Sequence, residues 1–294
     1  MNRRDLFKSL PLLTGAFVSR AEAEPPGSLA HTARFRTAIC AYSFRDALKS
    51  GAMTYEGLVR LAVELDVDGL DLTVYWFPNT SDEFLLPLRR AAYRMGVELY
   101  SISVRTDFCQ QSPELRQKEI EELKKWIDVA AKLGAGHVRV FGGDVPKGAT
   151  EDQAAGWVVE CLKRGAEHAA NRGVILGLEN HGGITSRAER VLQIVKGVDS
   201  PWVGINLDTG GYQRDPYREI EMCLPLAVNA QFKTEMERAD GTKEPADWAR
   251  LVGMFAKAGY KGYLALEYEA AEPAATAVPR LIKKLQELTR RSAA

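Results

Sequence analysis

The fold is decided by Val174-Ile175-Leu176-Gly177-Leu178-Glu179-Asn180-His181-Gly182-Gly183, an apolar run that ends in a carboxylate and a glycine loop. A buried ionised glutamate costs several kcal/mol unless a cation or hydrogen bonds compensate. Two further apolar runs end in the same way, residues 203–208 at Asp208 and residues 262–267 at Glu267. Three acids at the ends of three predicted strands indicate one shared cation.

On both sides of this stretch, short apolar strands alternate with amphipathic helices. The predicted strands begin near Phe35, Val67, Val97, His137, Val174, Val203, Ala227 and Tyr263. The predicted helices cover residues 54–65, 81–95, 112–133, 151–172, 186–195, 216–224, 245–258 and 275–290. Eight strand–helix units in about 260 residues are typical of an α/β protein, the (β/α)8 TIM barrel. The strands are apolar throughout, as expected when both faces are buried.

A doubly wound sheet is the alternative fold. It places a glycine-rich phosphate loop after its first strand, and residues 37–45 contain no glycine. Nothing in the composition of residues 35–290 indicates an internal linker. We therefore expect a single barrel domain over residues 35–294, preceded by a linker at residues 24–34.

Residues 1–23 are predicted to be an export signal of twin-arginine type. Arg3 and Arg4 precede a short apolar stretch, and Ala21-Glu22-Ala23 is a small-x-small cleavage signature. A basic tail is the alternative. The signal predicts a periplasmic protein, and its apolar stretch is too short for stable insertion into a membrane.

The composition limits the classes of partner. The 294 residues carry 39 basic and 39 acidic side chains, and this balance argues against nucleic acid held by phosphate contacts. The four cysteines match no metal or redox spacing, and no disulfide pairing follows from them. The sequence leaves a homo-oligomer open.

The predicted seventh strand, residues 227–235, supplies the fourth group of a metal site. Its residues Asn229, Gln231 and Lys233 share one face. The carboxyl ends of barrel strands meet at one face, so a cation there would have four candidate ligands: Glu179, Asp208, Gln231 and Glu267. Carboxylates with an amide favour a hard or borderline divalent ion. We expect Mn²⁺, with Mg²⁺, Co²⁺ and Zn²⁺ as alternatives.

Six short motifs at the predicted strand ends follow one another in a characteristic order. They are Tyr42-Ser43-Phe44, Gly69-Leu70-Asp71-Leu72, Leu178-Glu179-Asn180-His181, Asn206-Leu207-Asp208-Thr209-Gly210, Gln231-Phe232-Lys233 and Leu266-Glu267-Tyr268-Glu269. In order and spacing they resemble the xylose isomerase-like barrel family, which contains sugar phosphate isomerases and epimerases. The resemblance spans nearly all of residues 35–294.

The resemblance implies a divalent-metal enzyme. In the family's epimerases two Glu, one Asp and one His bind the metal, and the two Glu also act as the acid/base pair. The matching positions are Glu179, Glu267, Asp208 and Gln231, so this chain has Gln where the family usually has His. It also has Gly211 where many members carry a substrate-binding His. The family's endonuclease branch needs a histidine-rich zinc site, and this chain has only four histidines.

The candidates for substrate contact are His181, Lys233, Tyr42, Trp76 and Asn180. His181 either contacts sugar hydroxyls or bonds to the backbone of its loop. Lys233 either fixes a substrate oxygen or pairs with a neighbouring glutamate, Glu235 or Glu269. Tyr42 and Trp76 either form the apolar wall of a sugar pocket or belong to the core. The sequence does not decide whether Arg139 points into the barrel.

These residues favour a metal-dependent isomerase or epimerase acting on an unphosphorylated sugar. A proton would be removed beside a carbonyl, giving an enediolate. The alternatives are a lyase or hydratase acting on a keto-sugar or 3-keto-glycoside, and a non-catalytic sugar-binding protein. In each case the expected partner is a small carbohydrate.

Overall fold

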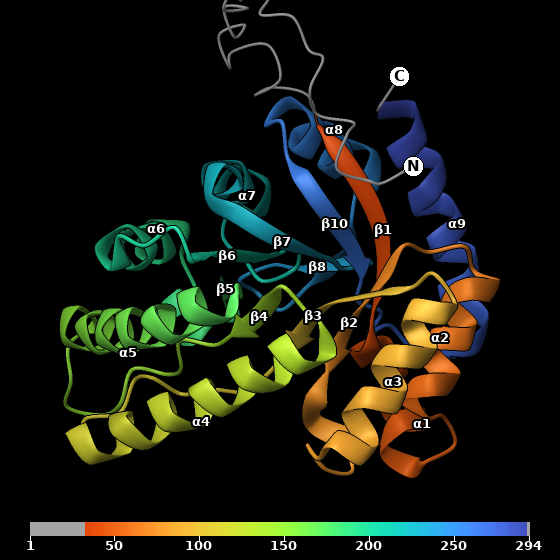
Figure 1. Cartoon of the computed structure of the whole chain (residues 1–294). Coiled ribbons are helices and arrows are strands. Elements are labelled where there is room, and N and C mark those ends of the chain that lie inside the picture. Colours follow the sequence, from red (N-terminus) through yellow and green to blue (C-terminus); the bar gives the residue numbers. More distant parts are fainter. Residues whose placement is uncertain (1–32, 293–294) are drawn as a thin grey trace, which may run out of the picture. The chain divides into compact units, whose positions relative to one another are not determined.

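The computed structural model describes residues 33–292, and the predicted export signal lies outside the described residues. Eight parallel strands close into a barrel in the order β1-β10-β7-β6-β5-β4-β3-β2, so the predicted (β/α)8 barrel is confirmed (Figure 1). The barrel strands are β1 (Arg34–Cys40), β2 (Gly69–Thr73), β3 (Glu98–Ser103), β4 (His137–Val140), β5 (Ile175–Glu179), β6 (Val203–Asp208), β7 (Ala227–Phe232) and β10 (Lys261–Leu266).

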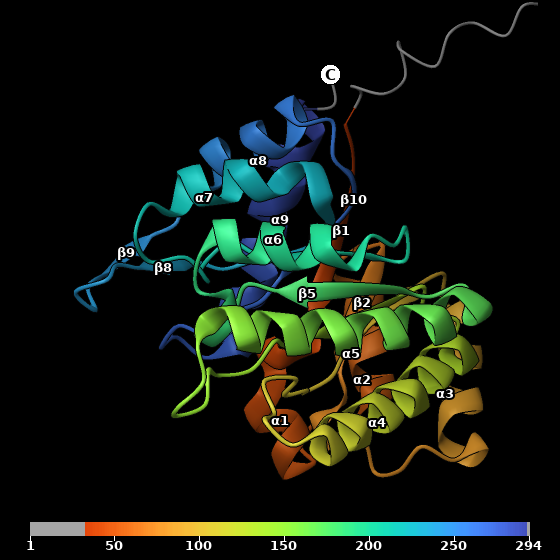
Figure 2. The ribbon, with the colours of Figure 1, turned by 90° about the vertical axis from the view of Figure 1, so that its left-hand side faces the viewer.

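Helices surround the barrel and cover the outer faces of its strands (Figures 1 and 2). They are α1 (Arg45–Ser50), α2 (Tyr55–Glu64), α3 (Asp82–Arg94), α4 (Pro113–Leu133), α5 (Glu151–Arg172), α6 (Ala188–Val198), α7 (Pro216–Cys223), α8 (Trp248–Lys257) and α9 (Ala274–Ser292). Helix α5 begins at a capping box of Thr150 and Gln153, which satisfies two backbone N–H groups that the first turn leaves free. No helix within residues 33–292 is long and apolar enough to cross a membrane.

A hairpin follows β7 where a continuous strand and then a helix were predicted. Strand β8 (Glu235–Glu237) pairs antiparallel with β9 (Lys243–Pro245), and helix α8 begins only at Trp248, after Asp247 caps its first turn. Met236 is fully buried and anchors the hairpin. Figure 2 shows the hairpin projecting from the body of the barrel.

The inside of the barrel is polar at the level of the site. The main apolar core lies between the strands and the helices, whereas several polar side chains are buried inside the barrel: Asp71, Arg139, Asn206, Asn229 and Gln231. The expectation of strands apolar on both faces is wrong for these positions. Buried polar groups are tolerated when they bond to one another, and their network fixes the orientation of the site residues above them.

Candidate active site

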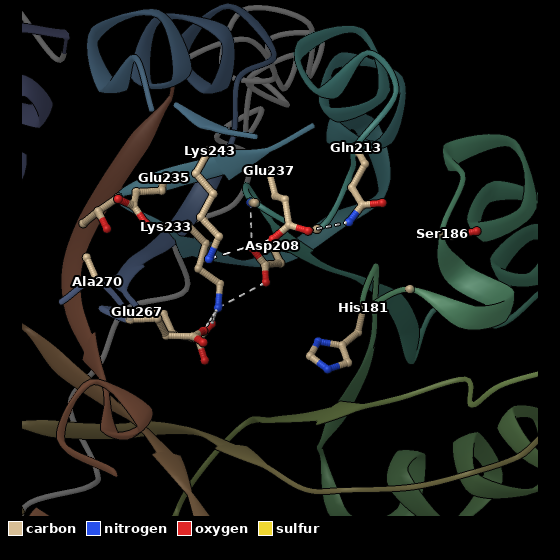
Figure 3. A pocket seen from close by; sticks show the side chains of 15 residues that line it. His181, Ser186, Asp208, Gln213, Lys233, Glu235, Glu237, Lys243, Glu267 and Ala270 are labelled. Atoms are coloured by element: carbon tan, nitrogen blue, oxygen red, sulfur yellow. Dashed lines mark hydrogen bonds and ion pairs between the residues drawn. The ribbon is translucent and has the colours of Figure 1, made fainter. Parts of the chain in front are cut away.

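A cavity of about 360 Å³ opens where β6, β7 and β10 end. Its floor and walls include His181, Asp208, Lys233, Glu267 and Glu269, and the β8–β9 hairpin adds Glu235, Glu237 and Lys243. In Figure 3, His181 stands across the cavity from Lys233 and Glu267. The parallel register pairs Asp208 with Gln231 and Glu179 with Asn206, which brings the predicted strand-end residues to one level.

Glu179 ends β5 and is buried among three partners. Its Oε2 lies 2.9 Å from Arg139 Nε and accepts a hydrogen bond from Asn206 Nδ2 at 3.1 Å, and its Oε1 lies 2.9 Å from His181 Nδ1. Arg139 therefore points into the barrel, which settles the question left open by the sequence. Burial opposes ionisation of Glu179, but Arg139 and His181 outweigh it and lower the pKa of this carboxyl.

Lys233 lies among three carboxylates. Its Nζ is 2.9 Å from Glu267 Oε2 and 3.5 Å from Asp208 Oδ2, and it also contacts Glu269 Oε1 (Figure 3). Burial disfavours the charged ammonium, but the three carboxylates outweigh it and raise the pKa of Lys233. The sequence left two roles open for Lys233, contact with a substrate oxygen and pairing with a glutamate. The structure contains the pairing, and Glu269 is one of the three carboxylate partners.

Glu267 follows β10 and differs from Glu179 in its electrostatics. Burial raises the pKa of Glu267 to about 7, Lys233 opposes the rise, and the nearby carboxylates Asp208 and Glu179 add to it. Its Oε2 is buried and, among residues 33–292, makes no hydrogen bond besides the ion pair to Lys233. Two carboxylates with pKa values pushed apart suit opposite roles in proton transfer.

The donor atoms fit a divalent ion in two respects. Glu179, His181 and Asp208 each offer one ligand atom, and these atoms lie within 4.8 Å of one another. Carboxylates with an imidazole suit Mn²⁺ and its neighbours among the divalent metals. The second respect is Glu267 Oε2, which follows β10, two strands from β6 in the barrel, and is buried without a hydrogen bond. His181 thus joins the candidate ligands, a role that its position two residues past Glu179 could have indicated.

Gln231 lies at the end of β7 as predicted, fully buried and with each polar atom engaged. Its Oε1 accepts a hydrogen bond from Asn206 Nδ2 at 2.8 Å, and its Nε2 donates to Asp71 Oδ2 at 3.0 Å and to Cys40 Sγ at 3.8 Å. Asn206 in turn donates to Glu179. The amide therefore links Asp71 to the residues that hold Glu179. Sequence reasoning missed Asp71 because its partner Gln231 lies 160 positions later in the chain, and it missed Asn206 because only the side-chain contacts show that it joins Glu179 to Gln231.

The other candidates for substrate contact lie beside the cavity. Asn180 is fully buried, donating to the Asp208 carbonyl and accepting from the Asp208 amide, both at 2.8 Å. It therefore holds Asp208 in place. Tyr42 and Trp76 are half-buried and pack against each other with ring centroids 5.9 Å apart. Neither ring is among the residues that line this cavity.

The model of the xylose isomerase-like TIM barrel family matches residues 59–288. The chain belongs to this family. No match is found among curated proteins.

Solved structures with the same architecture include two epimerases and a dehydratase. D-psicose 3-epimerase from Clostridium cellulolyticum H10 is 15% identical, with a TM-score of 0.69 over 88% of this chain and 99% of that one. The 3-keto-D-glucoside 4-epimerase YcjR from E. coli is 14% identical, with a TM-score of 0.69 over 87% and 99%. The probable 3-DHS dehydratase AsbF from Bacillus anthracis is 17% identical, with a TM-score of 0.65 over 87% and 98%. At these identities the likeness is one of fold.

Proposed function

We propose that the chain is a sugar isomerase or epimerase that moves a proton beside a carbonyl. The observation that carries this proposal is the meeting of Asp208 and Glu267 at a polar cavity, with Glu179 buried against the cavity residue His181. The epimerases that share the fold act on ketoses or a keto-glucoside by their names, which supports a small carbohydrate as substrate.

Glu267 and Glu179 are the proposed pair for proton transfer, and Glu267 lines the cavity directly. A pKa of about 7 lets the Glu267 carboxyl both accept and return a proton near neutral pH. The C–H bond beside the carbonyl breaks, the proton moves to Glu179, which Arg139 and His181 keep ionised, and the electron pair enters the enediolate. Glu267, which holds a proton up to about pH 7, delivers its proton to the enediolate from the opposite face.

Return of the proton decides the product. Delivery to the opposite face of the same carbon gives the epimer, and delivery to the neighbouring carbon gives the isomer. The Lys233 ammonium lines the same cavity and can donate a hydrogen bond to the oxygen that gains charge. Glu179, His181 and Asp208, with Glu267 beside them, would hold the divalent ion, Mn²⁺ by our proposal. When bound, such an ion supplies Lewis-acid polarisation of the carbonyl.

The charge of the cavity supports an unphosphorylated substrate. Of the residues that line it, five are acidic and two are lysines: Asp208, Glu235, Glu237, Glu267 and Glu269, with Lys233 and Lys243. A sugar phosphate would meet this excess of negative charge. An unphosphorylated substrate also agrees with the proposed export of the protein, since sugar phosphates are intermediates of the cytoplasm.

The test is solvent deuterium exchange followed by NMR on a panel of D-fructose, D-psicose, D-tagatose and methyl 3-keto-glucoside in D₂O with Mn²⁺. Incorporation of deuterium beside the carbonyl, together with a new epimer or isomer, is the expected result. Exchange followed by loss of water or of the methoxy group would identify the lyase or hydratase alternative instead. Binding of these sugars without any exchange would identify a sugar-binding protein and contradict the proposal.

A further inference from the structure

A second cavity adjoins the first at His181. It measures about 390 Å³ and shares His181 and Gly182 with the catalytic cavity. Its other walls come from the ends of β3 and β4, with Arg105, Asp107, Phe141 and Asp144 among its lining residues. The two cavities thus lie on either side of one side chain, whereas Asp208, Lys233 and Glu267 line only the first.

The imidazole of His181 forms a fixed partition between the cavities. Its Nδ1 lies 2.9 Å from Glu179 Oε1, its ring stacks on Phe141 with centroids 4.1 Å apart, and its backbone N–H donates to Thr185 Oγ1 at 3.1 Å. Thr106 in turn braces Phe141, because its Oγ1 donates to the Phe141 carbonyl at 2.8 Å and accepts from the Phe141 amide at 2.9 Å. The wall between the cavities is therefore preorganised.

The second cavity presents polar groups that the protein itself leaves unused. Asp144 is exposed and makes no hydrogen bond or ion pair with any residue in 33–292. Within the same range Arg105 forms no ion pair either, and its guanidinium lies 5.4 Å from the centroid of the Tyr75 ring. An acceptor and a donor of this kind match the hydroxyls of a sugar ring, and they lie beside a Phe141 ring that already contacts the His181 imidazole and the Arg139 guanidinium.

The backbone at Gly143 approaches the Asp107 side chain closely in this cavity. Gly143 has a positive φ of 97°, and a Cβ at this position would overlap Asp107 Oδ1. Asp107 is in turn held by Gln110 Nε2, which donates to its Oδ2 at 2.7 Å, and by the Cys109 amide at 3.1 Å. The glycine thus allows the β4 loop to approach the β3 loop, which defines this side of the cavity.

We propose that the second cavity binds a second sugar ring, so that the substrate is a disaccharide or another glycoside of a sugar. The inference rests on the proposed function, because it assigns the reacting keto-sugar to the cavity that Glu267 lines. Each cavity is near the lower end of the roughly 300–1,000 Å³ typical of small-molecule sites, so each suits one ring. The glycosidic bond would pass beside His181, because the imidazole of His181 lies between the two cavities.

The binding test uses sugar alcohols, which have no carbonyl and cannot react. We expect isothermal titration to show maltitol, a glucosyl-sorbitol, binding about tenfold tighter than sorbitol, the gain expected for a hydrogen bond to a charged group. Arg105→Ala and Asp144→Ala should each weaken maltitol binding by about threefold, together the full gain, and leave sorbitol binding unchanged. Arg94→Ala, at the exposed end of α3, is the matched control and should change neither.

Equal affinities for maltitol and sorbitol would overturn the inference, as would an equal loss for both sugars in Arg105→Ala and Asp144→Ala. Deuterium exchange then distinguishes failure of the second sugar site from failure of the proposed function. The assay compares D-fructose with three disaccharides that carry a hexose on different oxygens of fructose: isomaltulose, turanose and lactulose. Exchange with the same kcat/KM for all four would overturn the second sugar site and leave the proposed function standing. No exchange at all, with the preference for maltitol intact, would support the site while the proposed function failed.

Discussion

Glu267 and Glu179 have the same side chain but opposite environments. Glu179 faces Arg139 and His181, which lower its pKa, whereas burial raises the pKa of Glu267 to about 7. The sequence predicts both residues at strand ends. It could not predict their different protonation, because Arg139 comes from β4 and its direction is set by the twist and register of the barrel.

The raised pKa of Glu267 should appear in the pH dependence of stability. Between pH 4.5, its ordinary pKa, and about 7, the unfolded carboxyl is ionised while the folded one keeps its proton. The folded state then binds more protons, so this group lowers stability as the pH rises. We expect the stability of Glu267→Gln relative to the parent, measured by urea unfolding with EDTA, to increase from pH 5 to pH 8.

Glu98→Gln is the control for this experiment. Burial opposes ionisation of Glu98, but hydrogen bonds from Tyr263 and Arg36 outweigh it and lower the pKa of this carboxyl in the folded state, so both states are ionised above pH 5. The stability difference between this variant and the parent should therefore be flat from pH 5 to pH 8. A flat difference for Glu267→Gln as well would mean that Glu267 titrates at its ordinary pKa when folded.

Gln231 is expected to act on the site through its hydrogen bonds. Gln231→Met keeps the volume but removes one hydrogen bond from the buried Asp71 and one from the buried Asn206, which costs about 1–3 kcal/mol. We expect a lower free energy of unfolding in urea and an unchanged Mn²⁺ content by elemental analysis. Gln213→Met, on the exposed rim, should change stability by under about 0.5 kcal/mol. Loss of Mn²⁺ from Gln231→Met would identify Gln231 as a ligand, the role that the family resemblance implies.

At the scale of elements, the strands and helices were predictable from local pattern, and the β8–β9 hairpin was not. Residues 227–235 are predicted as one continuous strand with a polar face, but β7 ends at Phe232 and Glu235 already belongs to the hairpin. The reason is tertiary, since Met236 is buried against the rest of the fold. Most of the polar interior escaped prediction for a similar reason: β2, β4, β6 and β7 contribute one or two buried polar residues each, and only closure of the barrel joins them.

Strand β5 depends on Gly177, which allows the interior side chains to approach. A Cβ at this position would overlap His137 Nε2 and would lie 3.0 Å from Asn206 Cβ. We expect Gly177→Ala to lower the free energy of unfolding by about 1–3 kcal/mol, the usual cost of overpacking. Urea unfolding monitored by circular dichroism is the measurement.

Gly253 in α8 supplies the matched control, because a Cβ there would meet no atom within 4 Å. Gly253→Ala should raise stability by about 0.5–1 kcal/mol, since alanine loses less entropy in a helix. If Gly177→Ala were as stable as the parent, the close packing of His137 and Asn206 against β5 would be refuted.

At the scale of the whole molecule, the site joins strands that are far apart in the sequence. The candidate ligands come from the ends of β5 and β6, with Glu267 beside them after β10. A cation bound there stabilises the folded state in proportion to its affinity, because the unfolded chain has no such site. We expect Mn²⁺ to raise the Tm of EDTA-treated protein, and Asp208→Ala to abolish this rise.

Asp46→Ala, an exposed aspartate on α1, is the control and should retain the full rise in Tm with Mn²⁺. Equal rises in the parent and in Asp208→Ala would mean that the ion binds elsewhere. The predicted export signal belongs to the same scale. It stays a prediction, because residues 1–23 lie outside the described part of the chain.

The central claim is that Glu179 and Glu267 transfer the substrate's proton, and solvent deuterium exchange measures this transfer directly. The assay follows the rate at which deuterium enters the position beside the carbonyl of the most reactive ketose, in the parent and in three variants. Glu179→Gln and Glu267→Gln should each lower the exchange rate by about 10²–10⁴-fold, with a smaller effect on KM. Glu122→Gln, a surface glutamate on α4, should exchange at the parent rate. Near-parent exchange in both Glu179→Gln and Glu267→Gln would contradict the claim and assign the two carboxylates a structural role.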